Sequence, residues 1–193
     1  MTPESPALYE HPAAGLGPLR VVPVDPPRDA ALIHAWATEE RARFWGMREA
    51  TRADIEAAYA HLDTLTTHHA YLVRLHSDPV ALLQTYEPTQ DRVCEVYEPQ
   101  PGDVGAHIMV GPARGAGRRG FTAAVLSAVT GFLWADPARR RIVAEPDVRN
   151  VKAIERLLRT GFEPGPEVTL PEVTLPEVRI PAKRARLLFL RRG

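Results

Sequence analysis

The stretch from Asp103 to Phe162 decides the fold, and it reads DVGAHIMVGPARGAGRRGFTAAVLSAVTGFLWADPARRRIVAEPDVRNVKAIERLLRTGF. Its hydrophobic pattern alternates between strand and helix periods around one loop rich in Gly and Arg. The predicted elements are, in order, a strand (107–110), the loop (111–120), a helix (121–134), a strand (141–145) and a helix (151–160). A loop of this kind between a strand and a helix is suited to binding a pyrophosphate.

The rest of the chain predicts one domain of the α/β (α+β) class at residues 19–193, preceded by a loose N-terminal arm at residues 1–18. Thr51 followed by Asp54 indicates the capping box of one helix, and Asp29 is the expected cap of another. The further predicted elements are strands at 19–24, 70–75, 80–86, 162–170 and 184–190, a short strand at 93–97, and helices at 30–40 and 51–65.

The composition is balanced and excludes several functional classes. Lys plus Arg and Asp plus Glu both number 24 among 193 residues, so we expect neither a nucleic acid nor a membrane as partner. The single cysteine, Cys94, rules out an internal disulfide, and the histidines show no spacing typical of a metal site. No signal peptide or apolar stretch long enough to cross a bilayer is evident. We therefore expect a cytoplasmic protein without a bound metal.

The loop at 111–120 has the composition of an anion site. Its glycines let the backbone approach a ligand, its arginines add positive charge, and the following helix offers unpaired N–H groups. The alternative is a solvated surface turn, and composition alone favours neither. The glycines are Gly115, Gly117 and Gly120, and the arginines are Arg114, Arg118 and Arg119.

Two polar side chains on the predicted strands are candidates for proton transfer. His107 has a side chain suited to acting as a general base near neutral pH, although a lone histidine in a strand is usually structural. Asp147 follows an apolar strand directly, where open sheets place their ligand crevice. Asp147 or Asn150 is also expected to cap the next helix.

An aromatic pair, Phe44 and Trp45, follows the first predicted helix and precedes a glycine. This pair is a candidate wall of an acceptor pocket, and the alternative is packing in the core or in a lid. Cys94 has no activating neighbours in the sequence, so we interpret it as an inert thiol.

Taken together, residues 107–162 resemble the acyl-CoA core of the GNAT acyltransferase superfamily. The pyrophosphate loop of that family fits in two registers, 114–119 or 117–122, and the second places the start of the helix better. The second register implies that the phosphates are held by Gly117, Arg118, Arg119, Gly120 and Thr122. Asn150, Ala153 and Gly161-Phe162 keep the spacing of the family. Leu157 stands where many members have a tyrosine proposed to protonate the leaving thiolate, so that role is vacant or filled differently.

Within the superfamily the chain resembles the siderophore-biosynthesis acyltransferases, which acylate N-hydroxylysine, lysine or hydroxylated diamines. The resemblance rests on the aromatic run 44–47, on Gly-x-His at 105–107 and on Glu-Pro-Asp-Val-Arg-Asn at 145–150. It implies a mixed sheet of about six or seven strands with a splayed parallel pair that binds acyl-CoA, flanked by about four helices. It also implies that His107 and Asp147 form the catalytic pair.

The resemblance implies direct transfer from acetyl-CoA or another acyl-CoA to a small amine or hydroxylamine. The donor is expected between the His107 strand and the Arg141 strand, with its pantetheine arm on the backbone of Met109, Val110 and Gly111. His107 deprotonates the acceptor nitrogen and Asp147 orients it. The product with an N-hydroxyamine is a hydroxamate, which binds iron(III).

Two alternatives remain open from the sequence. One is an acetyltransferase of another small polyamine, such as an aminoglycoside. The other is a non-catalytic module that binds acyl-CoA, which the imperfect loop and the absent tyrosine would suit. The acyl group, the acceptor and the oligomeric state are not fixed by the sequence.

Overall fold

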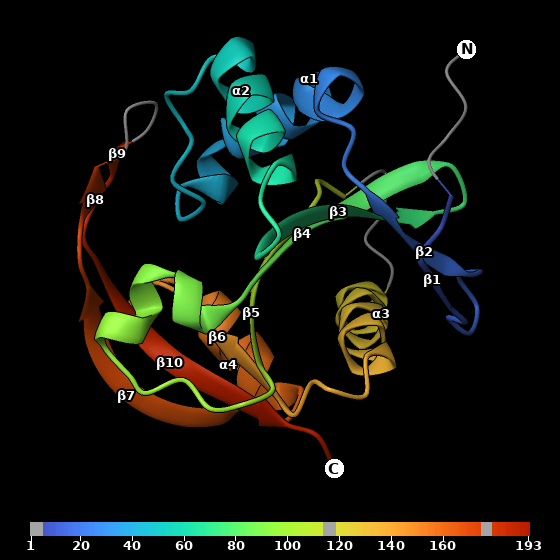
Figure 1. Ribbon diagram of the computed structural model, residues 1–193. Coiled ribbons are helices and arrows are strands. Elements are labelled where there is room, and N and C mark those ends of the chain that lie inside the picture. The colour runs from blue at the N-terminus through green and yellow to red at the C-terminus, as the bar shows by residue number, and fades with distance from the viewer. Residues whose placement is uncertain (1–5, 114–118, 175–178) are drawn as a thin grey trace. The chain divides into compact units, whose positions relative to one another are not determined.

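The computed structural model describes residues 6–113, 119–174 and 179–193 (Figure 1). Within these residues the strands form one eight-stranded sheet, in the order β1-β2-β3-β4-β5-β6-β10-β7, and a two-stranded sheet of β8 and β9. The helices are α1 (Pro26–Ala37), α2 (Arg52–Asp63), α3 (Phe121–Ala135) and α4 (Val151–Arg159). The strands are β1 (Tyr9–His11), β2 (Leu19–Pro23), β3 (His68–Leu75), β4 (Asp78–Tyr86), β5 (Asp103–Val110), β6 (Arg141–Ala144), β7 (Glu163–Leu170), β8 (Val173–Thr174), β9 (Arg179–Ile180) and β10 (Lys183–Arg191).

Parallel and antiparallel pairs occur in the same sheet, since β5 pairs with β6 in parallel whereas β10 pairs with β6 and β7 antiparallel. This mixed sheet with four α-helices confirms the predicted α/β class. The sheet is larger than expected because the N-terminal segment supplies β1. No helix of the described residues is long and apolar enough to cross a membrane.

The chain divides into two compact units, and the boundaries between them fall within β4, within β5 and just after α3. Unit 1 comprises residues 1–84 and 108–136, and unit 2 comprises residues 85–107 and 137–193. Unit 1 therefore carries α1, α2 and α3, and unit 2 carries β6, α4, β7 and β10.

In unit 1, α1 begins at Pro26, before the predicted start at residue 30, because Asp25 caps the helix and Asp29 does not. The Asp25 carboxylate accepts the Arg28 N–H at 3.2 Å. Proline is tolerated in the first turn because its missing N–H would have no partner there. Asp29 is instead a buried carboxylate that accepts the Asp25 N–H at 2.9 Å.

The predicted capping box of α2 is confirmed. The Thr51 hydroxyl accepts the Asp54 N–H at 3.2 Å, and the Asp54 carboxylate accepts the Thr51 N–H at 2.8 Å. Helices α1 and α2 lie side by side in Figure 1 and share one apolar core, with Ile33 and Ile55 fully buried. This core holds α1 against α2.

The expectation of a loose arm fails at Tyr9–His11, which forms β1 and pairs antiparallel with β2. The Tyr9 ring lies 6.1 Å from the Phe132 ring of α3, and the neighbouring Gly131 leaves room for the Tyr9 hydroxyl. Aromatic packing on α3 therefore orders this segment, and its few residues carried no strand pattern of their own.

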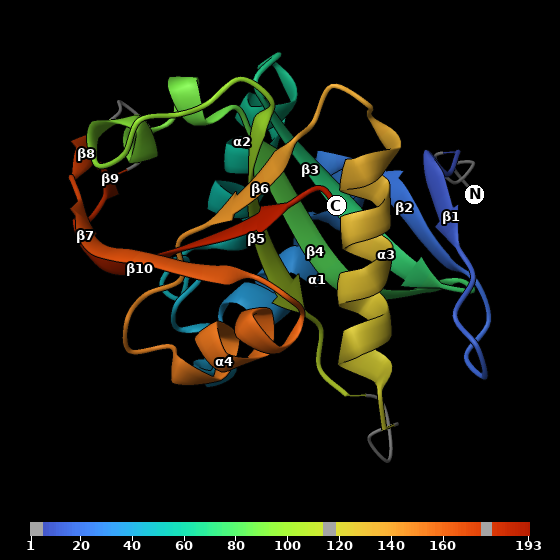
Figure 2. The ribbon, with the colours of Figure 1, turned by 90° about the horizontal axis from the view of Figure 1, so that it is seen from below.

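In unit 2, β10 lies between β6 and β7 and pairs with both (Figure 2). At the first pair of the parallel ladder, the Arg141 guanidinium donates two hydrogen bonds to the Asp103 carboxylate, both at 2.7 Å. The same guanidinium lies 4.6 Å from the centre of the Phe189 ring. A forked ion pair of this kind holds the start of β5 against β6.

The short strand predicted at 93–97 is wrong, because Arg92–Glu95 forms a 3₁₀ turn. The Asp91 carboxylate accepts the Val93 N–H at 2.9 Å and so caps this turn. Val93 is fully buried beside Tyr86 and Leu187 in the core of unit 2. Its apolar side chain therefore serves the core without belonging to a strand.

Candidate active site

A buried carboxylate, Glu145, lies at the centre of a polar cluster in unit 2. It follows β6 directly, and all four residues of that strand are buried. Its side chain is 3% exposed, and its Oε2 accepts the Tyr86 hydroxyl at 2.7 Å. Burial, followed by the Glu145 charge, raises the pKa of the Tyr86 hydroxyl well above its ordinary value, so this hydroxyl stays a donor.

His107 joins the cluster from β5. Its Nε2 is hydrogen-bonded to Oε1 of Glu145, and its ring centre lies 5.1 Å from the Tyr86 ring. The register of the parallel ladder explains this contact, because His107 and Glu145 each lie two residues beyond the pair Gly105 and Val143. The imidazole is 35% exposed, so solvent reaches the ring while its carboxylate partner is sealed off.

Lys183, the first residue of β10, is the fourth member of the cluster, with Nζ 3.5 Å from Oε1 of Glu145. Burial alone would raise the pKa of the Glu145 carboxyl. The His107 charge and hydrogen bond, the Lys183 charge and the Tyr86 hydrogen bond outweigh burial and leave that pKa below its usual range. Glu145 is therefore ionised at neutral pH despite its burial.

Asp147 is buried two residues further on, and its described side-chain hydrogen bonds are with Arg149. The Arg149 guanidinium donates to both carboxylate oxygens, at 2.9 and 2.7 Å, and the Arg149 N–H donates to Oδ1 at 2.9 Å. These hydrogen bonds lower the pKa of Asp147, and the nearby Lys183 charge lowers it further. Lys183 thus influences Glu145 and Asp147 alike, whereas the direct pairing of His107 with Asp147 stays a prediction.

Gly105, two residues before His107, makes room for the Tyr86 ring. A Cβ atom at Gly105 would lie 2.0 Å from Cζ of Tyr86 and 2.1 Å from its Cε2. Tyr86 is itself buried in the core of unit 2. The glycine of the Gly-x-His motif therefore has a packing role: it admits the tyrosine that holds Glu145.

The predicted phosphate loop is only partly visible, because Gly117 and Arg118 lie outside the described residues. Arg119 is exposed, Thr122 is partly buried, and Gly120 is the N-terminal cap of α3 in unit 1. Gly120 has a φ of +81°, open space where a Cβ would stand, and no side-chain hydrogen bond to the first turn. In unit 2, Asn150 caps α4 by accepting the Ala153 N–H at 3.3 Å.

The backbone groups predicted to hold a pantetheine arm belong to unit 1 at the end of β5. Met109 is buried in the core of that unit. The Val110 carbonyl accepts a hydrogen bond from the Arg41 guanidinium, and the Gly111 N–H donates to the Val80 carbonyl at 2.8 Å. A ligand that uses the Val110 carbonyl would therefore compete with Arg41.

The aromatic pair of unit 1 is divided between two environments. Trp45 packs against the core formed by α1 and α2. The Phe44 ring lies 4.7 Å below the Arg43 guanidinium. Trp45 therefore has the packing role that the sequence left as an alternative, and a role for either ring in binding an acceptor stays a prediction.

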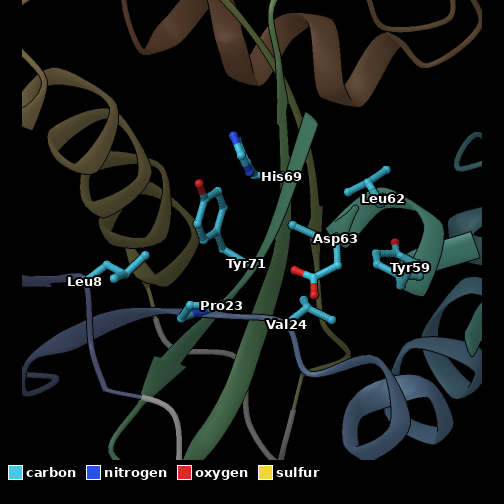
Figure 3. A pocket seen from close by; sticks show the side chains of 9 residues that line it. Leu8, Pro23, Val24, Tyr59, Leu62, Asp63, His69 and Tyr71 are labelled. Carbon is cyan, nitrogen blue, oxygen red and sulfur yellow. The ribbon is translucent and has the colours of Figure 1, made fainter. Parts of the chain in front are cut away.

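A cavity of about 190 Å³ lies in unit 1 (Figure 3). His69 and Tyr71 reach it from β3, and Asp63 reaches it from the end of α2. None of its lining residues was a predicted site residue. Among the described residues, no group of three or more His, Cys, Asp or Glu side chains could hold a metal ion.

Sequence reasoning missed three members of the cluster: Tyr86, Glu145 and Lys183. The available signal was a glutamate that continues the apolar run Ile142-Val143-Ala144, a place where a charged side chain needs buried partners. A buried carboxylate that binds a histidine next to solvent is an arrangement suited to proton transfer.

The fold and this cluster define an α/β protein with a candidate acid–base site. Residues 25–170 match the family model described as an acetyltransferase (GNAT) domain. The chain belongs to this family, which confirms the resemblance predicted from residues 107–162.

Among the relatives, N(6)-hydroxylysine O-acetyltransferase from Escherichia coli is 30% identical over 142 residues, which are 72% of this chain. The chain spans 44% of the length of that relative. An uncharacterized protein from Bacillus halodurans has a TM-score of 0.80 at 23% identity, covering 97% of this chain and 92% of its own. The aminoglycoside acetyltransferase AAC(6')-Ib, solved with coenzyme A and kanamycin, has a TM-score of 0.73 at 23% identity, covering 90% and 95%.

Proposed function

We propose that this protein transfers an acyl group from acyl-CoA to the nitrogen of a small amine or hydroxylamine, with His107 as the general base. The observation that supports the proposal is the hydrogen bond between Nε2 of His107 and the buried carboxylate of Glu145. An ionised carboxylate only accepts hydrogen bonds, so Nε2 carries the proton and Nδ1 is the basic nitrogen. We retain Asp147 as the group that orients the acceptor.

The reaction needs no covalent enzyme intermediate. The acceptor nitrogen attacks the thioester carbonyl, a C–N bond forms, and the proton of the nitrogen passes to Nδ1 of His107. The C–S bond then breaks and coenzyme A leaves as a thiolate. The imidazolium returns its proton to that thiolate, which restores the base and fills the role that Leu157 cannot perform. Holding the two reactants together supplies much of the acceleration.

The residues at the start of α3 fit a pyrophosphate. The first turn of α3 contains no acidic residue. Because Gly120 has no side chain, the N–H groups of that turn are open on the side where a Cβ atom of residue 120 would stand. Helix N-termini bind anions through such groups and through the helix dipole. We assign the diphosphate to Gly117, Arg118, Arg119, Gly120 and Thr122, the pantetheine arm to Met109, Val110 and Gly111, and a further contact to Asn150.

A pair of variants at Gly120 tests the diphosphate site. Asp and Asn both tolerate a positive φ and have the same shape, so they differ mainly in charge. We expect Gly120→Asp to weaken acetyl-CoA binding about tenfold by repulsion of the diphosphate, and Gly120→Asn to change it less than about threefold. Titration calorimetry at fixed ionic strength measures both. Equal affinities for the two variants would place the diphosphate elsewhere.

Charge balance favours a siderophore-type acceptor over a polycation. Glu145 lies beside Lys183, and Asp147 is paired with Arg149, so both carboxylates that we assign to the site already have cationic neighbours. A strongly cationic acceptor is better matched by carboxylates without such neighbours. The relative that acts on N(6)-hydroxylysine supports the same acceptor class. An aminoglycoside is the second candidate, supported by the similarity in fold to AAC(6')-Ib.

A thiol-release assay with acetyl-CoA over a set of acceptors tests the proposal. The set is N6-hydroxylysine, lysine, N-hydroxycadaverine, cadaverine, spermidine and kanamycin. We expect kcat/KM to be at least about tenfold higher for the best hydroxylamine or lysine acceptor than for kanamycin, because the carboxylates at the site are already compensated. Faster turnover of kanamycin would favour the second candidate. Binding of acetyl-CoA without thiol release from any acceptor would favour the non-catalytic module.

The same assay separates N-acylation from O-acylation. An N-acylated hydroxylamine is a hydroxamate and gives a coloured iron(III) complex, whereas an O-acylated one does not. We expect the coloured complex to form in proportion to released thiol. Thiol release without colour would mean that the acyl group is transferred to oxygen, and it would overturn the proposal that the nitrogen is the nucleophile.

A further inference from the structure

Glu145 has more partners than a structural carboxylate in a sheet requires. A buried carboxylate is costly unless it is paired and hydrogen-bonded, and the simplest solution for a fold is an apolar residue. Here Tyr86, His107 and Lys183 converge on one carboxylate from three different strands, β4, β5 and β10. Tyr86 is buried, Lys183 is partly buried, and His107 is the most exposed of the three.

We infer that Glu145 is the positioning residue of His107, and that Tyr86 and Lys183 hold Glu145 in place. The inference rests on the proposed function for its catalytic consequence, although the geometry stands without it. Glu145 holds the imidazole in the tautomer with the proton on Nε2, which directs the basic Nδ1 away from the carboxylate. It also provides the counter-charge when Nδ1 accepts a proton. Carboxylates act on histidine in this way in hydrolase triads.

The two other partners have distinct tasks. The Tyr86 hydroxyl occupies Oε2, which leaves Oε1 for His107. Lys183 gives Glu145 a cationic neighbour that does not depend on the protonation of His107. The cluster is therefore charge-balanced while the imidazole is neutral, which is the state a general base must have before reaction.

A spectroscopic test on the free protein addresses the tautomer directly. At a pH where the ring is neutral, side-chain ¹⁵N shifts of His107 are expected to report a protonated Nε2 and an unprotonated Nδ1. The signal is assigned by its loss in His107→Gln. In Glu145→Gln we expect both tautomers, because an amide can donate as well as accept. A wild-type ring protonated at Nδ1 overturns the inference whether or not any acceptor reacts.

A kinetic cycle then tests whether Glu145 acts through His107. We expect Glu145→Gln to lower kcat about 30-fold, within the range for partners that orient a functional histidine, with KM for acetyl-CoA changed less than about threefold. In a His107→Gln background the same substitution should cost less than about twofold, since a positioning residue has no effect without the residue it positions. If Glu145→Gln lowers kcat in that background by the same factor as in the wild type, the inference is overturned.

Two controls separate this role from folding and from the proposed function. Glu155→Gln removes an exposed carboxylate of α4 that pairs with Arg159, and it should leave turnover and the denaturation midpoint unchanged. Glu145→Asp keeps the charge and should recover part of the loss. If His107→Gln leaves turnover intact, the proposed function of His107 as general base fails. The ¹⁵N measurement of the His107 tautomer still tests whether Glu145 positions the imidazole. A Glu145→Gln loss that Glu145→Asp does not reduce would count against the inference.

Discussion

Replacing His107 with glutamine lowers kcat by about 10³-fold, because general-base catalysis by a positioned side chain typically contributes 10²–10⁴-fold. Glutamine is the informative replacement, since its amide N–H can still donate to Glu145 while it offers no basic nitrogen. The affinity for acetyl-CoA should change less than about threefold, because the diphosphate and pantetheine contacts belong to other residues. Steady-state kinetics with the best acceptor and titration of acetyl-CoA measure the two quantities.

The comparison with His107→Ala separates catalysis from stability. Alanine leaves the buried Glu145 without one of its hydrogen-bond donors, which costs about 1–3 kcal/mol of unfolding free energy, whereas glutamine retains the donor. Both variants should lose the same activity, and only the alanine variant should lose stability in urea titrations. A glutamine variant with wild-type turnover would remove His107 from the mechanism.

Most elements of the fold could be predicted because their signals are local. The capping box at Thr51 and Asp54 uses groups three residues apart, and the apolar periods of α3 and α4 lie within single helices. The segment at Arg92–Glu95 failed for a non-local reason: Val93 is apolar because the core of unit 2 needs it, and no partner strand pairs with it among the described residues.

The candidate site could likewise be predicted only where its signals are local. Alternation places Glu145 and Asp147 on the same side of the chain, and only Asp147 was predicted to pair with His107. Which of them meets the imidazole depends on the register of β5 on β6, and those strands are joined through a loop and α3. The structure pairs Gly105 with Val143, and that register brings Glu145 to His107. A shift of two residues would have brought Asp147 instead.

Gly105→Ala should be the most damaging conservative change in unit 2. The added methyl would lie 2.0 Å from the Tyr86 ring, and neither side yields easily. Gly105 is tied to Val143 in the parallel ladder, and Tyr86 is buried against Val93 and Leu187. Overpacking of this kind costs about 3 kcal/mol. Displacement of the ring also removes the hydroxyl from Glu145, so kcat should fall together with the denaturation midpoint.

A matched glycine in unit 1 shows whether the effect is specific. Gly131→Ala adds the same methyl in α3, where it meets the hydroxyl end of Tyr9 at 2.4 Å. That side chain lies on the edge strand β1 and can move its tip, and alanine favours the helix, so the unfolding free energy should change by less than about 1 kcal/mol. Comparable losses at both glycines would mean that backbone flexibility, and not the Tyr86 ring, makes Gly105 necessary.

The clash itself is isolated by a double-mutant cycle with Tyr86. Tyr86→Ala removes the ring and by itself costs about 3–5 kcal/mol through the cavity it leaves. The Gly105 methyl then enters that space, so the double variant should be about 2 kcal/mol more stable than the sum of the single losses predicts. Tyr86→Phe keeps the ring and should give no such recovery. Additive losses in both cycles would show that the Tyr86 ring is not the reason why residue 105 must be a glycine. The glycine of Gly-x-His would then have no packing role in the Glu145 cluster.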